Sequence, residues 1–173
     1  MKFLESLENT LAKWYKGTPD LPKNGQKGLV KYLPWITLVI GLLELWSAWL
    51  LWHWAHVANS LVNYANTLSQ LYGGTTVTLQ KMSAGIWIGV ILLFIEAILL
   101  LLAVPGLRSQ RKSGWDLIFY VSIVNVVYGV VIALTNYGGA FNLVENLILS
   151  AIGLYFLFQI REYYKSDSRK SAS

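Results

Sequence analysis

Four long apolar stretches divide the chain, with polar segments between them. A helix that crosses a bilayer needs about 20 predominantly apolar residues, and none of the four stretches contains a lysine or an arginine. The sequence therefore predicts an all-α integral membrane protein whose transmembrane domain, residues 32–163, is a four-transmembrane-helix bundle. The predicted spans cover residues 33–57, 83–104, 115–135 and 142–160.

Turn-forming residues lie where these stretches stop. Pro105 and Gly106 follow the second stretch, and Gly138 and Gly139 lie between the third and the fourth. Proline cannot continue the hydrogen bonding of a helix, and glycine tolerates a positive φ. We therefore predict that the second span ends before Pro105 and that a turn separates the last two spans.

The positive charges predict how the bundle is oriented. Cytoplasmic loops of membrane proteins carry an excess of lysine and arginine. The only such residue on one side of the predicted bundle is Lys81. The other side carries the remaining thirteen: Lys2, Lys13, Lys16, Lys23, Lys27, Lys31, Arg108, Arg111, Lys112, Arg161, Lys165, Arg169 and Lys170. Both termini are therefore predicted to be cytoplasmic, an N-in/C-in arrangement.

The segments outside the spans also carry patterns. Residues 1–31 are predicted to form a cytoplasmic amphipathic helix followed by a linker at residues 17–22. The apolar side chains of that helix recur at helical spacing: Phe3, Leu4, Leu7, Leu11 and Trp14. Such a helix lies in the membrane interface as an anchor, or else forms a docking surface for a partner.

The outer loop, residues 58–82, is predicted to be helical as far as Gly73. Leu61, Ala65, Leu68 and Tyr72 form an apolar stripe along it. The polar tail, residues 164–173, is predicted to be disordered.

Composition narrows the classes of function. The chain is 55% hydrophobic and 13% charged, whereas soluble domains average about 25% charged residues. It contains no cysteine, which excludes disulfides, thiolate metal sites and a cysteine nucleophile. We find no phosphate-binding loop, zinc-protease motif or nucleophile elbow. The bilayer is the expected partner, and we expect no nucleic acid, metal, cofactor or enzymatic activity.

Three polar residues are predicted to lie near the middle of the bilayer: Glu44, Glu96 and Asn125. Polar residues at this depth are costly, and an ionisable one is a functional-site hypothesis by default. At 100° per residue, Tyr128 shares the face of Asn125. We take these four residues as candidates for binding a proton or a cation.

The two glutamates share their helix faces with small residues, which let helix backbones approach closely. The bulky tryptophans of both spans are predicted to point away from these faces. The residues predicted to pack the helices are Gly41 and Ala48 in the first span, Gly85 and Gly89 in the second, and Gly129 in the third.

Two interpretations of the glutamates remain open. In one, Glu44 and Glu96 form a coupled carboxyl pair that shares a proton or coordinates a small cation. In the other, they are neutral carboxyls that hydrogen-bond across helices to Asn125 or Tyr128 and only pack the bundle.

Two functions follow from these interpretations. The first is a non-enzymatic accessory or assembly component of the cytoplasmic membrane, expected in a prokaryote as a homo-oligomer or within a larger membrane complex. The alternative is a small transporter, coupled to protons or cations, that uses the mid-membrane carboxyl pair. The two glutamates favour the transporter. We favour the first function, because it is the more common one for small membrane proteins and because four helices leave little room for a water-filled cavity.

Overall fold

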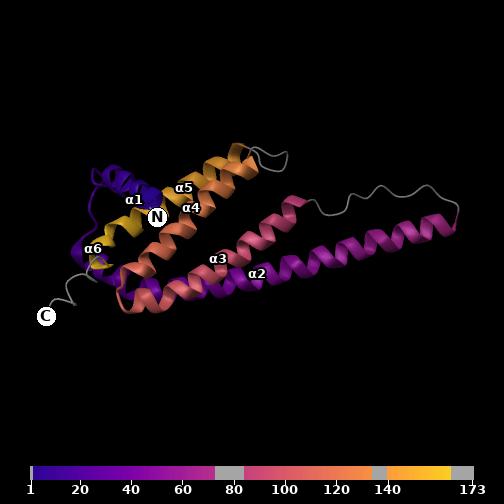
Figure 1. The fold of residues 1–173 in the computed structure, drawn as a ribbon, viewed down its shortest axis with the longest axis horizontal. Helices are drawn as coiled ribbons and strands as arrows, with labels where there is room; N and C mark the ends of the chain where they lie inside the picture. The colour runs from indigo at the N-terminus through magenta and orange to yellow at the C-terminus, as the bar shows by residue number, and fades with distance from the viewer. Residues whose placement is uncertain (1, 73–83, 134–139, 165–173) are drawn as a thin grey trace. The chain divides into compact units, whose positions relative to one another are not determined.

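The computed structural model describes residues 2–72, 84–133 and 140–164, and every element within these ranges is an α-helix. The chain order of the helices can be followed in Figure 1. The helices are α1 (Lys2–Tyr15), α2 (Lys23–Leu71), α3 (Ala84–Arg108), α4 (Lys112–Ala133), α5 (Ala140–Gln159) and α6 (Arg161–Tyr164).

Three helical segments are long and apolar enough to cross a membrane: Lys23–Leu71, Trp87–Arg108 and Lys112–Val130. These three helical segments are consistent with a membrane protein. Within α5, the apolar segment Leu147–Gln159 is shorter. The predicted fourth span, the bundle of four and the orientation of the termini therefore stay predictions.

Helix α2 is longer than the predicted first span at both ends. It begins at Lys23 rather than near Leu33, so the residues between the predicted linker and the apolar stretch are helical. Pro34 lies inside it, where its nitrogen cannot donate to the carbonyl of Val30. At the other end α2 continues into the outer loop as far as Leu71. Residues 73–83 lie outside the described part of the chain.

The predicted end of the second span at Pro105 is wrong, because α3 continues to Arg108. Pro105 lacks an N–H donor, but this does not end the helix, because the next turn keeps its hydrogen bonds. The N–H of Ser109 donates to the carbonyl of Pro105 at 3.1 Å. The helix ends where Gln110 adopts φ 51°. There the N–H of Gln110 donates to Leu107 O and that of Arg111 to Gly106 O, the two bonds of a Schellman motif.

The chain forms two compact units, residues 1–38 with 102–173 and residues 39–101. The core of the first unit is aromatic. Trp115 stacks on Phe119 with ring centroids 5.4 Å apart, and its indole N–H donates to the carbonyl of Leu157 at 2.9 Å. This bond joins α4 to α5, which run side by side in Figure 1. Tyr164, the first residue of the predicted tail, belongs instead to α6 and is buried in this core.

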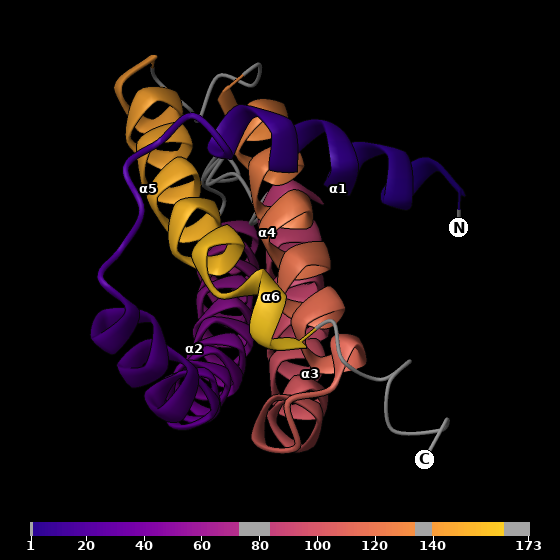
Figure 2. The same ribbon diagram turned by 90° about the vertical axis from the view of Figure 1, so that its left-hand side faces the viewer.

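Helix α1 packs against α4 and α5 in the same unit (Figure 2). Leu7 and Leu11 pack against the core, and Tyr15 stacks on Phe158 with centroids 5.2 Å apart. The Tyr15 hydroxyl also donates to the carbonyl of Ala151 at 3.0 Å. The apolar face of the predicted amphipathic helix is therefore partly used for packing within the protein.

A buried carboxylate fastens α1 to α4 and α6. Glu8 is only 5% exposed. It accepts a hydrogen bond from the Nε of Arg161 at 2.7 Å and pairs with the Nζ of Lys112 at 3.4 Å. Lys112 is shared with Asp116 of α4, and Arg161 also donates to Asn9. Removing one partner of such a group is costly, because the remaining charge stays buried.

The linker after α1 is held by α5. The carbonyl of Pro19 accepts hydrogen bonds from the Tyr155 hydroxyl at 2.7 Å and from the Gln159 amide at 3.3 Å. The N–H of Leu21 donates to the Gln159 side chain, to which Gln26 of α2 also donates. Gln159 therefore ties the linker and the start of α2 to the end of α5.

Two glycines allow α3 and α4 to meet, and the first prediction concerns them. A Cβ on Gly106 would lie 2.7 Å from the backbone nitrogen of Gly114, and a Cβ on Gly114 would lie 2.9 Å from the Cα of Gly106. Backbone cannot move aside as a side chain can, so Gly114→Ala should lower stability by roughly 1–3 kcal/mol or more. Thermal unfolding of the purified protein in detergent measures this.

Gly28 supplies the matched control, since a Cβ there meets nothing within 4 Å. Gly28→Ala should raise stability by about 0.5–1 kcal/mol, because alanine loses less backbone entropy in a helix. Equal melting temperatures for the two variants would contradict the close approach of α3 and α4.

The second prediction concerns alkaline stability. Burial raises the pKa of Tyr164 from 10.0 to about 12. Both states keep the phenol neutral below about pH 10, but between pH 10 and 12 the unfolded state loses its proton first. The free energy of unfolding should therefore fall over this window, by roughly 2–3 kcal/mol from this group.

Tyr164→Phe should remove that part of the fall, which unfolding experiments at pH 9 and 11 measure. At pH 7 the variant should be as stable as the wild type, since the hydroxyl has no hydrogen-bond partner among the described residues. Tyr32→Phe, at an exposed position outside the other sites, is the control. An alkaline loss that is the same in both variants would refute the prediction.

Candidate functional site

The two predicted glutamates belong to the second unit. Glu44 is half-buried on α2, and Glu96 of α3 is 5% exposed. One oxygen of Glu44, Oε2, is buried and has no hydrogen-bond partner within the described residues. Burying a carboxyl oxygen without a hydrogen-bond partner costs free energy.

The packing of α2 on α3 sets the level of the two carboxyl groups. These helices run side by side in both ribbon views (Figures 1 and 2). A Cβ on Gly41 would lie 3.2 Å from the Leu101 side chain, and near the other end the rings of His56 and Trp87 are 5.2 Å apart. An antiparallel pair in this register brings Glu96 to within one helical turn of the level of Glu44.

Small residues flank both glutamates along this contact. Ala48 and Ala55 of α2 and Ala97 of α3 are buried. Trp46 and Trp49 of α2 are more than half exposed, as expected for side chains that face lipid. In α3, Gly89 is half-buried, while the surroundings of Gly85 lie outside the description.

The other candidate residues belong to the first unit. Asn125, Tyr128 and Gly129 lie on one face of α4, and all three are half-buried. Their grouping with the glutamates as one site stays a prediction.

An apolar groove of about 840 Å³ lies beside the carboxyl groups in the second unit. Its ten lining residues are all apolar and include Leu45, Trp49 and Phe94. Neither glutamate is among them.

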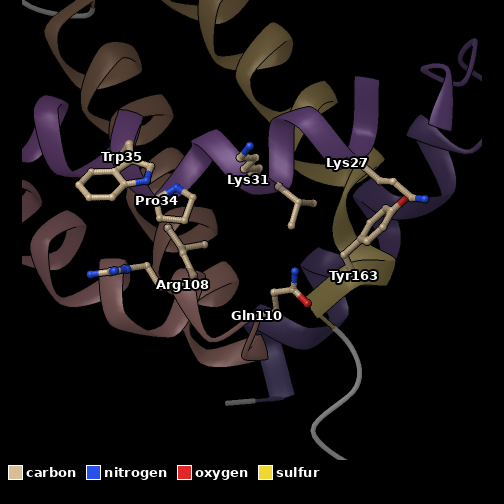
Figure 3. A pocket seen from close by; sticks show the side chains of 9 residues that line it. Lys27, Lys31, Pro34, Trp35, Arg108, Gln110 and Tyr163 are labelled. Carbon is tan, nitrogen blue, oxygen red and sulfur yellow. The ribbon is translucent and has the colours of Figure 1, made fainter. Parts of the chain in front are cut away.

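A cationic cavity of about 500 Å³ in the first unit is a second candidate site, which the sequence patterns did not reveal. It lies between the start of α2, the end of α3 and α6. Figure 3 shows Trp35 and Arg108 together at one end and Lys27 with Tyr163 at the other. The nine residues that line it are Lys27, Val30, Lys31, Pro34, Trp35, Leu107, Arg108, Gln110 and Tyr163.

Local structure fixes several of these side chains. The Schellman turn after α3 carries Gln110 to the cavity wall. The Tyr163 hydroxyl donates to Gln26 at 3.3 Å, and the guanidinium of Arg108 lies 5.4 Å from the centre of the Trp35 ring. In the sequence, the lysines served only to predict the orientation of the bundle. The cavity becomes apparent only from contacts between elements that lie far apart in the chain.

Comparisons of the chain with known protein families, with curated proteins and with solved structures find no match.

Proposed function

We propose that the protein is a non-enzymatic assembly component of the membrane, whose copies join through the outer part of α2. The observation that carries this proposal is a row of exposed apolar side chains near the end of that helix. Leu61, Tyr64 and Leu71 are 63%, 64% and 75% exposed.

The spacing of this row is that of a coiled coil. Val57, Leu61, Tyr64, Leu68 and Leu71 follow one another at intervals of four, three, four and three residues. A heptad with apolar a and d positions keeps one seam of a helix against a partner helix. The same seam on a second copy is its natural complement, because a twofold interface uses the same surface twice.

Charge and length favour a partner for this segment. Residues 57–72 contain no charged side chain, so two copies would meet without repulsion. The 49 residues of α2 extend about 74 Å, more than twice the roughly 30 Å of a bilayer's hydrocarbon core. The seam follows the predicted span, and apolar side chains in water are more stable when covered.

The glutamates support the same proposal through their surroundings. Both lie at the contact of α2 with α3 among small residues, which is what helix packing requires. They are absent from the linings of the apolar groove and the cationic cavity.

One observation favours the alternative, a proton- or cation-coupled transporter. Glu44 Oε2 is buried with no hydrogen-bond partner in the described part of the chain, within one helical turn of the level of Glu96. Two carboxyl groups at neighbouring levels would be suited to share a proton. The assembly proposal and this alternative differ in whether Glu44 takes part in moving protons or cations across the membrane.

The third prediction tests self-association with single cysteines, which the cysteine-free chain allows without background. Tyr64→Cys, at a seam position, should form a disulfide-linked dimer in oxidised membranes, since paired d positions of a parallel coiled coil lie within bonding reach. Non-reducing gel electrophoresis measures the dimer.

Asn63→Cys is the matched control. Asn63 is next to Tyr64 in the sequence and is also exposed, but its side chain points about 100° away from the seam. It should give several-fold less dimer. Equal crosslinking of both variants, or none in either, would refute assembly through this seam.

The fourth prediction decides between the two functions. Wild type, Glu44→Gln and Glu162→Gln are reconstituted in liposomes that contain a pH-sensitive dye, and an inward proton gradient is applied. We expect the same slow leak from all three, because Glu44 serves packing. A faster dissipation in the wild type that only Glu44→Gln abolishes would establish the transporter instead.

A further inference from the structure

The charges of the cationic cavity are unbalanced. Lys27 and Lys31 lie one turn apart on α2, Arg108 comes from the end of α3, and no carboxylate is among the nine lining residues. None of these three cations forms an ion pair with any described residue, since the ion pairs there join Glu8 and Asp116 to other cations. Like charges four residues apart on a helix repel each other, so an anion would stabilise this arrangement.

The neutral groups of the cavity suit an oxyanion. Arg108 rests on the face of Trp35, which leaves the edge of the guanidinium and its N–H donors to bind oxygen atoms in pairs. The Gln110 amide adds a neutral donor at the wall. Arginine with lysine and neutral donors is a recurrent combination at phosphate sites.

Gln110 provides an observation independent of the charges. Its φ of 51° lies in the left-handed region, and glycine is the residue that this position of a Schellman motif favours. A glutamine held there is strained, and strain of this kind concentrates where a side chain serves a ligand. The side chain that glycine would lack is the one that lines the cavity.

The position along the helices points to a lipid rather than a soluble ligand. Lys27 and Lys31 come just before the apolar part of α2, and Arg108 comes at the end of the apolar part of α3. Charges at these places lie at the level of the headgroups, where Trp35 and Tyr163 are also typical. The volume of about 500 Å³ is in the usual range for small-molecule sites.

We infer that this cavity binds the phosphate headgroup of an anionic membrane lipid, with Lys27, Lys31 and Arg108 around the phosphate and Gln110 as an additional donor. Basic pockets between transmembrane helices hold lipid headgroups in this way. The inference is independent of self-association through α2.

The fifth prediction is tested by native mass spectrometry of the detergent-solubilised full chain, titrated with phosphatidic acid and, separately, with phosphatidylcholine. The wild type should bind phosphatidic acid in preference. Lys27→Gln/Lys31→Gln should bind it about 30-fold more weakly, at roughly fivefold for each lysine near the phosphate.

Lys13→Gln/Lys16→Gln is the matched control, because it removes the same charge from two exposed lysines that do not line the cavity. It should stay within about twofold of the wild type, as surface charges outside the site contribute little. An equal loss in both double variants would mean general attraction to the surface and would overturn the site.

Soluble phosphates distinguish the source of the headgroup. Glycerol 3-phosphate and inorganic phosphate are added as competitors to the protein with bound phosphatidic acid. Failure of both at millimolar concentration supports the lipid, whose chains add apolar contacts. Displacement of phosphatidic acid by either competitor, at a micromolar concentration equal to that of the lipid, would overturn the proposal that the ligand is a lipid. The ligand would then be a soluble phosphate.

Gln110→Gly separates binding from folding. Relief of the left-handed strain should raise the melting temperature, while loss of the amide should weaken phosphatidic acid binding several-fold. Unchanged binding in this better-folded variant would exclude Gln110 from the site.

Discussion

The buried carboxylate of Glu8 is the interaction on which the arrangement of the first unit depends. Taking a carboxylate out of water costs several kcal/mol, which is recovered only if its partners stay in place. Those partners come from distant parts of the chain, Lys112 at the start of α4 and Arg161 at the start of α6. The position of α1 is therefore tied to the positions of α4 and α6.

This constraint continues inward from the ion pair. The guanidinium of Arg161 lies 5.9 Å from the centre of the Trp115 ring, whose N–H holds the Leu157 carbonyl of α5. Within α6, Tyr163 donates to Gln26 of α2 and forms one end of the cationic cavity. The geometry of the cavity thus rests on contacts that begin at Glu8.

The sequence predicted the features that depend on neighbours along one helix. Apolar stretches predicted the three helices that are long and apolar enough to cross a membrane, and the outer stripe of Leu61 and Leu68 predicted the extension of α2. It failed at Pro105, where local rules expect an end, because the next turn supplies the hydrogen bonds that prolong α3. The pairing of Glu8 with Arg161 and the cavity could not be predicted, since periodicity carries no information about which distant residues meet.

The helices inside one unit are held by other interactions than those inside the second. The properties of a lipid bilayer account for this difference. Lipid tails are as apolar as leucine, so burial of apolar surface does little to join helices inside the membrane. The contact of α2 with α3 relies on close approach at Gly41 and Ala48 and leaves Trp46 exposed. In the first unit, ion pairs, hydrogen bonds and aromatic stacking hold the helices. Polar groups are concentrated there, which is why we propose the binding site for a charged headgroup at these helix ends and not among the glutamates of the α2–α3 contact.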